Sequence, residues 1–243
     1  MSSTSGKKQS PAVVIMKREL GVYFTSPVAY IVTGLFLIIA GILFFAVFFL
    51  QNRAELRNYF SLLPILLSFF IPALTMRIFA EEKRSGSIET LMTLPVTETD
   101  VVTGKFLAAF LSSAVMIAPT VLYIIPVVIF GNPDAGPIIG GFLGALFLCA
   151  AFSAIGVFAS SITKNQIIAF FTAFIICIAL TMIDQFLVFL PAGIVTVLSY
   201  ISANAHFTSI SRGIIDTRDL LYFISITAFF FYLTVITQQD ERR

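Results

Sequence analysis

The side chains that could take part in chemistry are few in this chain, and many of the charged ones fall in one stretch. Residues 78–100, IFAEEKRSGSIETLMTLPVTETD, hold seven of the twenty-eight charged side chains. Four of them, Glu81–Arg84, are adjacent and stand between long apolar runs. Unpaired charges are costly to bury, so this stretch belongs in water. There it can form ion pairs and polar contacts with a soluble partner.

The rest of the chain offers no catalytic centre. It has one histidine, His206, and two cysteines, Cys149 and Cys177, which both lie inside apolar runs. No Ser-His-Asp arrangement, paired-carboxylate site or metal site can be assembled from this set. The glycine-lysine pairs at 6–7 and 104–105 lack the upstream glycine and the following Ser or Thr of a phosphate-binding loop. We therefore expect no enzyme activity, no metal and no directly bound cofactor, so that energy for any work comes from a partner.

The composition indicates a membrane protein. Hydrophobic residues make up 58%, charged residues 12%, and the mean hydropathy is +0.98. Ordinary globular domains have about 45–50% apolar and about 25% charged residues. Such a chain cannot cover itself with polar surface, so lipid must be its solvent. The net charge of +2 does not suggest nucleic acid as a partner.

The apolar runs predict an all-α fold with six membrane-spanning helices. About 20 apolar residues are needed to cross a bilayer, and lipid satisfies backbone hydrogen bonds only within helices. The predicted spans are about 28–50, 59–79, 103–130, 138–161, 166–189 and 220–237. They form a single transmembrane domain over 13–237, after a disordered tail at 1–12 and before a cytoplasmic tail at 238–243. Residues 13–25 are expected to form an amphipathic helix on the membrane surface.

Lys and Arg residues set the predicted orientation. With the N-terminus inside, the cytoplasmic side carries eleven of them and the outer side four. By the positive-inside rule, both termini and residues 78–100 are cytoplasmic. The charged stretch then reads as a helix, a break at 85–87, a short helix ended by Pro95, and a new helix start at Thr97. It is either a solvated connector or an element that transmits motion from a soluble partner.

On the outer side, residues 190–219 are predicted to form a re-entrant or interfacial helical hairpin. The apolar part near 192–201 is too short to span, yet too apolar for a plain loop. Four charged residues of alternating sign are expected to hold the hairpin together: Arg212, Asp216, Arg218 and Asp219. Asp184, near the outer end of the fifth span, is either a substrate or interface contact or a group that caps the hairpin or pairs with an arginine. Glycines at 136, 140 and 144 predict close helix packing, with the same chain favoured as the neighbour.

The charged stretch resembles the signature of ABC-2-type transporter permeases. The resemblance is carried by FAEEKRSGSIE at 79–89, Leu91, Pro95-Val96 and Gly104-Lys105, and the order of spans extends it across nearly the whole chain. It implies an intracellular coupling helix that docks into a groove of a separate ATPase. The coupling residues implied are Glu81, Glu82, Lys83, Arg84, Gly86, Ile88, Glu89, Leu91 and Met92. A second stretch, HFTSISRGIIDTRDL at 206–220, resembles the gliding-motility-associated branch of the family, and it marks His206 in the outer hairpin.

This resemblance implies a membrane-spanning permease subunit of an ABC exporter in the bacterial inner membrane. Two permease copies would work with two cytoplasmic ATPase subunits, which bind the ATP and Mg, and the branch implies a membrane-anchored auxiliary subunit with an extracytoplasmic domain. The first span has almost no polar groups, with Thr33 as the exception, which argues for a hydrophobic or lipid-like substrate. The alternative is ATP-driven force transmission to an extracytoplasmic partner without transport. A secondary transporter would need more buried ionisable residues than Asp184.

Overall fold

The computed structural model describes residues 10–51, 55–87, 96–131, 133–186, 200–214 and 216–242. In these ranges every regular element is a helix, which confirms the all-α prediction. The elements are α1 (Pro11–Thr25), α2 (Pro27–Gln51), α3 (Arg57–Thr75), α4 (Ala80–Ser85), α6 (Glu98–Ile117), the 3-10 helix η1 (Ala118–Tyr123), α7 (Ile124–Phe130), α8 (Ala135–Ser161), α9 (Gln166–Phe186), α11 (Ala203–Ser211) and α12 (Thr217–Arg242).

Six helical segments of the described chain are long and apolar enough to cross a membrane, as predicted. They are Pro27–Phe49, Arg57–Ser85, Glu98–Phe130, Ala135–Ser161, Gln166–Gln185 and Thr217–Asp240. The third one is interrupted, because α6 gives way to η1 at Ala118, one residue before Pro119. Proline lacks the N–H that an α-helix needs and its ring crowds the preceding turn, which explains the change at this point.

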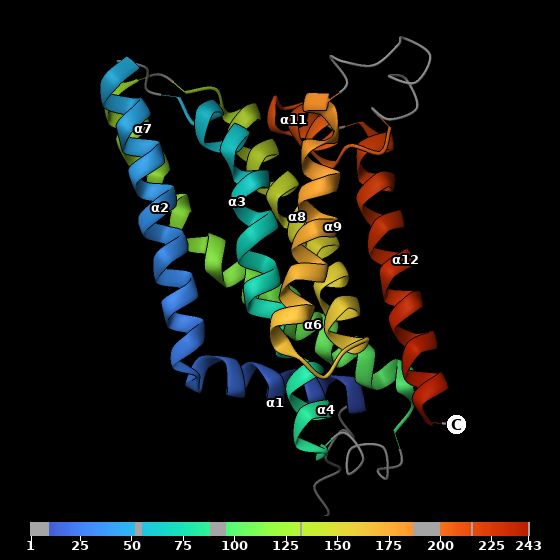
Figure 1. The fold of residues 1–243 in the computed structure, drawn as a ribbon. Helices are drawn as coiled ribbons and strands as arrows, with labels where there is room; N and C mark the ends of the chain where they lie inside the picture. Colours follow the sequence, from blue (N-terminus) through green and yellow to red (C-terminus); the bar gives the residue numbers. More distant parts are fainter. Residues whose placement is uncertain are drawn as a thin grey trace, which may run out of the picture.

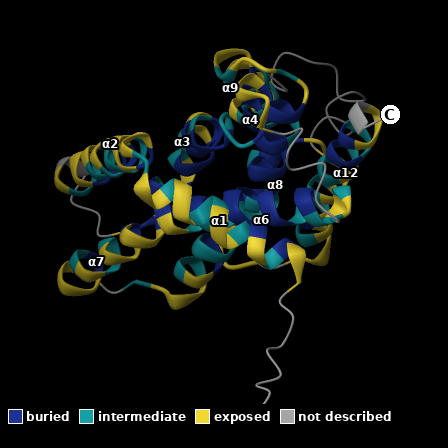
Figure 2. Ribbon diagram, turned by 90° about the horizontal axis from the view of Figure 1, so that it is seen from below, coloured by how far each residue is buried: buried dark blue, intermediate teal, exposed yellow. Residues whose placement is uncertain are grey.

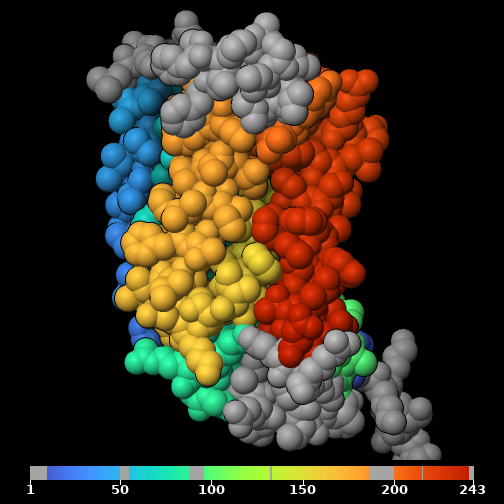
Figure 3. All heavy atoms as spheres, turned by 45° about the vertical axis from the view of Figure 1, so that its right-hand side comes forward, coloured from blue at the N-terminus to red at the C-terminus, as the bar shows by residue number. Residues whose placement is uncertain are grey.

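The helix α8 is the centre of the bundle. In the apolar stretch of α8 that could cross a membrane, 67% of the residues are buried, against 17% in α12 and 22% in both α2 and α9. It packs against α3, α6, α9, α11 and α12, and Figure 2 shows it as the mostly buried helix inside the others. Figure 3 shows α9 (orange) and α12 (red) covering one face, with part of α8 (yellow) visible between them.

The glycines of α8 are placed where α11 approaches it. A Cβ atom at Gly140 would lie 2.3 Å from the carbonyl oxygen of Ile210, and one at Gly144 would lie 3.2 Å from the Ile210 side chain. The backbones can come this close only because the glycines have no side chain. The predicted small-residue stripe therefore packs within this chain. A Cβ at Gly136 would meet nothing within 4 Å.

The helix α1 lies across the end of the bundle, beneath the long helices in Figure 1. It begins at Pro11, two residues before the predicted start, because proline is favourable in the first helical turn. Its partner is α6, where a Cβ atom at Gly104 would lie only 2.7 Å from the carbonyl oxygen of Ala12. Residues 1–9 are outside the described residues, so the disordered tail stays a prediction. We call this end of the bundle the α4 end and the opposite one the α11 end.

Candidate functional site

The helix α4 is short and has defined ends. Gly86 ends it with a φ of 74°, the left-handed conformation that glycine adopts most easily. The helix therefore ends within the break predicted at 85–87, with Ser85 still part of α4. The start of α6 is also as predicted: Thr97 and Asp100 form a reciprocal capping box, in which the Asp100 N–H donates to the Thr97 hydroxyl at 3.2 Å.

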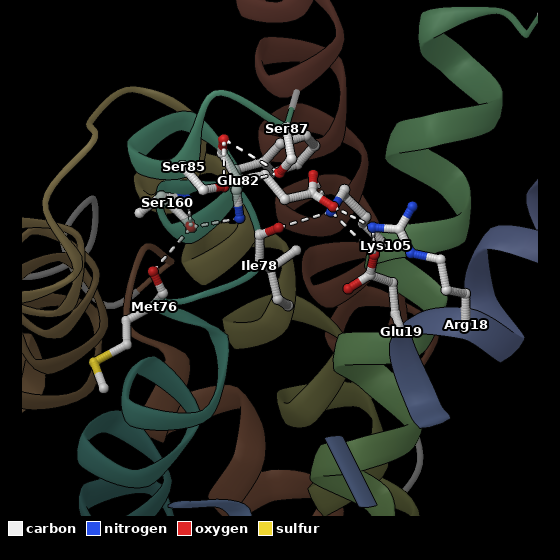
Figure 4. A network of polar contacts seen from close by, with 11 residues as sticks. Arg18, Glu19, Met76, Ile78, Glu82, Ser85, Ser87, Lys105 and Ser160 are labelled. Carbon is white, nitrogen blue, oxygen red and sulfur yellow. Dashed lines mark hydrogen bonds and ion pairs between the residues drawn. The ribbon is translucent and has the colours of Figure 1, made fainter. Parts of the chain in front are cut away.

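One serine of α8 fixes the start of α4. The Ser160 hydroxyl accepts hydrogen bonds from the backbone N–H groups of Phe79 at 2.9 Å and Ala80 at 3.0 Å, and it donates to the carbonyl of Met76 at 3.0 Å. Ser160 is fully buried. The first N–H groups of a helix have no partner within the helix, so the Ser160 hydroxyl provides the hydrogen-bond acceptor that the start of α4 needs. Figure 4 shows Ser160 between Met76 and the α4 backbone.

A second set of contacts ties α4 to α1 and α6 through a buried lysine. Lys105 Nζ, with its side chain 0% exposed, lies 2.8 Å from Glu82 Oε2 and 3.2 Å from Glu19 Oε1, and donates to the carbonyl of Ile78 at 2.7 Å. Arg18 donates to the other oxygen of Glu82 at 2.5 Å. Figure 4 shows these groups converging from three parts of the chain. We call Arg18, Glu19, Glu82 and Lys105 the charge cluster.

The charge cluster is balanced and mostly shielded from water. Its two cations face two carboxylates: Lys105 is fully buried, the side chains of Glu19 and Glu82 are only 14% and 13% exposed, and Arg18, 52% exposed, forms the side toward water. Breaking a buried ion pair by removing one partner typically costs about 3–5 kcal/mol, because the other charge stays buried without compensation. The cluster therefore holds α1, α4 and α6 in one arrangement.

The four adjacent charges of the coupling stretch do not behave alike. Glu82 belongs to the charge cluster, and Lys83 is buried and donates to the backbone carbonyl of Ser161 at the end of α8. Glu81 points outward, 49% exposed, and pairs with Arg77 at 2.8 Å. Arg84 and Gly86 are also exposed. The remaining predicted coupling residues lie outside the described residues: Ile88, Glu89, Leu91 and Met92.

The sequence did not mark Arg18, Glu19, Lys105 or Ser160 as site residues. A usable signal was present for Lys105, which is a lone lysine in α6 just before a long apolar run, where a charge needs a partner. The partner could not be named, because Glu19 is 86 residues away in the chain.

At the α11 end, the structure brings together two of the five residues predicted for the outer hairpin. His206 Nδ1 lies 2.6 Å from Asp219 Oδ1, and the His206 ring stacks on Tyr222 at 4.1 Å between centroids. Three predicted residues are exposed and take no part in this pair: Arg212, Asp216 and Arg218. Among the described residues of the hairpin, the ion pair is thus between His206 and Asp219, and a role of the other three charges in holding the hairpin together stays a prediction. Residues 187–199 lie outside the described residues, so the hairpin stays a prediction.

Asp184 also reaches α11. Its Oδ2 accepts a hydrogen bond from the side-chain amide of Asn204 at 2.7 Å. In the described part of the chain, this amide is its partner, rather than Arg212 or Arg218. The contact links the end of α9 to the start of α11, and the substrate role considered for Asp184 stays a prediction. No group of His, Cys, Asp and Glu side chains suited to a metal ion is found among the described residues.

Six long apolar helical segments in the described chain, five of them around the central α8, with a small charged helix fixed at one end, define a multi-pass membrane protein. Residues 54–237 match the model of the ABC-2 family transporter protein, so the chain belongs to this family. Members of the family are membrane permease components of ABC transporters and work with an ABC ATPase subunit. The family resemblance of the charged stretch is thereby confirmed. No curated protein matches the chain.

Proposed function

We propose that this chain is the permease subunit of an ABC exporter that uses ATP hydrolysis by a separate subunit to export or extrude a hydrophobic or lipid-like substrate. The observation that carries the proposal is the attachment of α4. This helix of six residues contacts α8 through Ser160 and Lys83, and α1 and α6 through Glu82. A displacement of α4 by a docked ATPase would therefore reach three other helices.

The two outward charges of α4 are the docking contacts in this proposal. Glu81 and Arg84 are exposed, whereas Glu82 and Lys83 are occupied within the chain. Exposed polar groups can contact a partner without breaking buried pairs, so Glu81 and Arg84 are suited to docking. Glu82 and Lys83 are suited to passing the motion of α4 on to the neighbouring helices. Ile88, Leu91 and Met92 would anchor the following segment in the ATPase groove, and the α4 end would face the cytoplasm.

The apolar character of α2 supports a hydrophobic substrate. Both hydroxyl groups near its start contact α1: Thr33 lies 3.2 Å from the hydroxyl of Tyr23, and the Tyr30 hydroxyl donates to the carbonyl of Phe24. Its outward face is apolar over several turns, at Ile31, Leu35, Ile38, Ile42, Phe45 and Phe49. A hydrophilic solute would find few hydrogen-bond partners along this surface.

The complete assembly would contain two copies of this permease and two ATPase subunits in the bacterial inner membrane. ATP and Mg would be bound by the ATPases, and the gliding-motility-associated branch would add a membrane-anchored auxiliary subunit. Force transmission to an extracytoplasmic partner remains the second candidate, since it uses the same α4 attachment. Release of labelled lipid from reconstituted vesicles on addition of ATP separates the two, because only the exporter releases lipid.

The docking role is tested by co-purification from native membranes. The variant Glu81→Arg/Arg84→Glu reverses both outward charges of α4, and we expect at least tenfold less ATPase to co-purify, the loss that follows from about 1.4 kcal/mol of binding free energy. The control is Arg57→Glu, an exposed charge reversal at the start of α3. Equal amounts of ATPase with the wild type and both variants would contradict the docking role, and no ATPase with any of them would contradict the proposed function.

A further inference from the structure

A cavity of about 180 Å³ lies at the α4 end, between α1, the start of α2, the end of α3 and α4. It stands at the level where the long apolar helices end and the charged groups begin. Phospholipid headgroups occupy this level in a membrane. The charge cluster forms one side of the cavity through Arg18, Glu19 and Glu82, and Arg77 and Glu81 form another.

The cavity carries charges of both signs. Two guanidinium groups and three carboxylates line it, and Lys105, just behind the wall, neutralises one carboxylate through its contacts with Glu19 and Glu82. The three cations and three carboxylates together then have no net charge. A ligand with only negative or only positive charge would gain little net attraction here, whereas a ligand with one group of each sign matches it.

Arg77 and Glu81 offer the two kinds of contact that such a ligand needs. The contacts of Arg77 with Glu81 and Ser26 use three of the five guanidinium N–H groups, which leaves donors for a phosphate. The Glu81 side chain is 49% exposed, and each of its oxygens, which accept one hydrogen bond from Arg77, has a second lone pair for an ammonium group. Tyr23 also lines the cavity, and because burial raises the pKa of its hydroxyl, it stays protonated and can donate.

The other walls are apolar. Val22, Val28, Ala29 and Leu74 line the cavity, and Val22 and Val28 are 54% and 38% exposed at its rim. A soluble headgroup would leave this surface uncovered, whereas the first part of an acyl chain would cover it.

We propose that this cavity binds the headgroup of a zwitterionic phospholipid with a primary ammonium group, as in phosphatidylethanolamine. The phosphate lies against Arg18 and Arg77, the ammonium lies against Glu81, and the acyl chains leave past Val22 and Val28. This role goes beyond the proposed transport function, because the bound lipid can stabilise the junction of α1, α3 and α4 without ATP or an ATPase.

The chain contains no tryptophan, so a single introduced tryptophan reports on lipid at one place. Phe24→Trp places the fluorophore next to Tyr23, a cavity residue whose ring centroid lies 5.3 Å from that of Phe24. Phe24 is 43% exposed, and Phe229→Trp places the fluorophore on the exposed face of α12, at a residue that is 58% exposed. The purified full-length chain is reconstituted with phosphatidylethanolamine, phosphatidylcholine or phosphatidylglycerol carrying brominated acyl chains, and quenching at equal mole fractions gives relative association constants.

We expect phosphatidylethanolamine to bind beside Phe24→Trp about threefold more strongly than the other two lipids, the effect of a single additional hydrogen-bonded contact. At Phe229→Trp the three lipids should quench equally. Adding Arg77→Gln or Glu81→Gln to Phe24→Trp should abolish the preference, whereas Arg84→Gln, an exposed arginine outside the cavity, should keep it.

Three results would overturn the inference. Equal quenching by the three lipids beside Phe24→Trp would show no headgroup selection, and a preference for phosphatidylglycerol would indicate general attraction of anions. Displacement of the brominated lipid by soluble phosphoethanolamine at equal concentration would show that the apolar walls contribute nothing. Because no ATPase is present, these outcomes are independent of the proposed transport function.

Discussion

Lys105 is the side chain on which the α4 end depends most. It is fully buried, and its ammonium group forms ion pairs with Glu19 and Glu82 and donates a hydrogen bond to the carbonyl of Ile78. It also lies 4.8 Å from the centre of the Phe79 ring, a favourable position for a cation. Every contact that compensates its burial comes from outside α6, so one residue connects three segments.

Replacing this lysine should destabilise the protein strongly. In Lys105→Ala, Glu19 and Glu82 lose their buried cation and keep Arg18, whose side chain is 52% exposed, so we expect the free energy of unfolding to fall by about 3 kcal/mol. Unfolding in mixed micelles with increasing denaturing detergent measures this change. The matched control is Lys164→Ala, an exposed lysine, which should change stability by about 0.5 kcal/mol or less. Equal stability of the two variants would show that the charge cluster contributes nothing.

At the level of elements, the packing of α11 on α8 depends on the absence of a side chain. The closest approach is between Gly140 and the backbone of Ile210. Backbone cannot move aside as a side chain can, so any added atom must separate the two helices. This contact positions His206 and Asn204, which bind groups of α12 and α9.

The variant Gly140→Ala should therefore be less stable than the wild type by about 1–3 kcal/mol, as expected for overpacking. Gly136→Ala is the control in the same helix, because its new Cβ meets nothing within 4 Å. The control should change stability by about 0.5 kcal/mol or less, because Gly136 is the second residue of α8 and precedes Pro137, where alanine has no interior-helix advantage. Thermal unfolding of both variants in the same detergent measures the difference. A Gly140→Ala variant as stable as Gly136→Ala would contradict the close approach.

The elements could be predicted from the sequence better than their contacts. Apolar runs of sufficient length identified the six long helices, because in lipid the backbone has no alternative to a helix. The partners of individual charges could not be predicted in this way. Glu82 and Lys83 look like their neighbours Glu81 and Arg84 in the sequence, and only the position of α4 relative to α1 and α8 turns the first two inward. The pairing of His206 with Asp219 could not be predicted either, because it depends on how α11 lies against α12.

For the whole molecule, the attachment of α4 to α8 is the proposed route from ATP hydrolysis to the membrane. Ser160 makes this attachment with a single hydroxyl that accepts from two backbone N–H groups. Its neighbour Ser161 uses its own hydroxyl only locally, in a 2.7 Å hydrogen bond to the carbonyl of Phe158. The two adjacent serines therefore form a matched pair for an experiment.

In the variant Ser160→Ala, the N–H groups of Phe79 and Ala80 lose their acceptor, and the hydrogen bond from Lys83 to the Ser161 carbonyl is left to hold α4 on α8. We expect the ATPase to co-purify as with the wild type, while ATP-dependent lipid release from vesicles falls about tenfold, equivalent to about 1.4 kcal/mol of lost coupling. Ser161→Ala should retain release within about twofold, because only a local hydrogen bond is lost. Unchanged release in Ser160→Ala would show that force does not pass through this contact.

The pairing of α1 with α6 also constrains how the protein is made. Glu19 and Lys105 are 86 residues apart, and α2 and α3 lie between them in the chain. Synthesis proceeds from the N-terminus, so α1 leaves the ribosome before its partner exists. While two spans are inserted, α1 can contact only α2 and the segment around α4, through Tyr23 and Arg18. The arrival of Lys105 then adds the contact with α6, so the N-terminal helix completes its packing only after half of the membrane segments have begun to enter the bilayer.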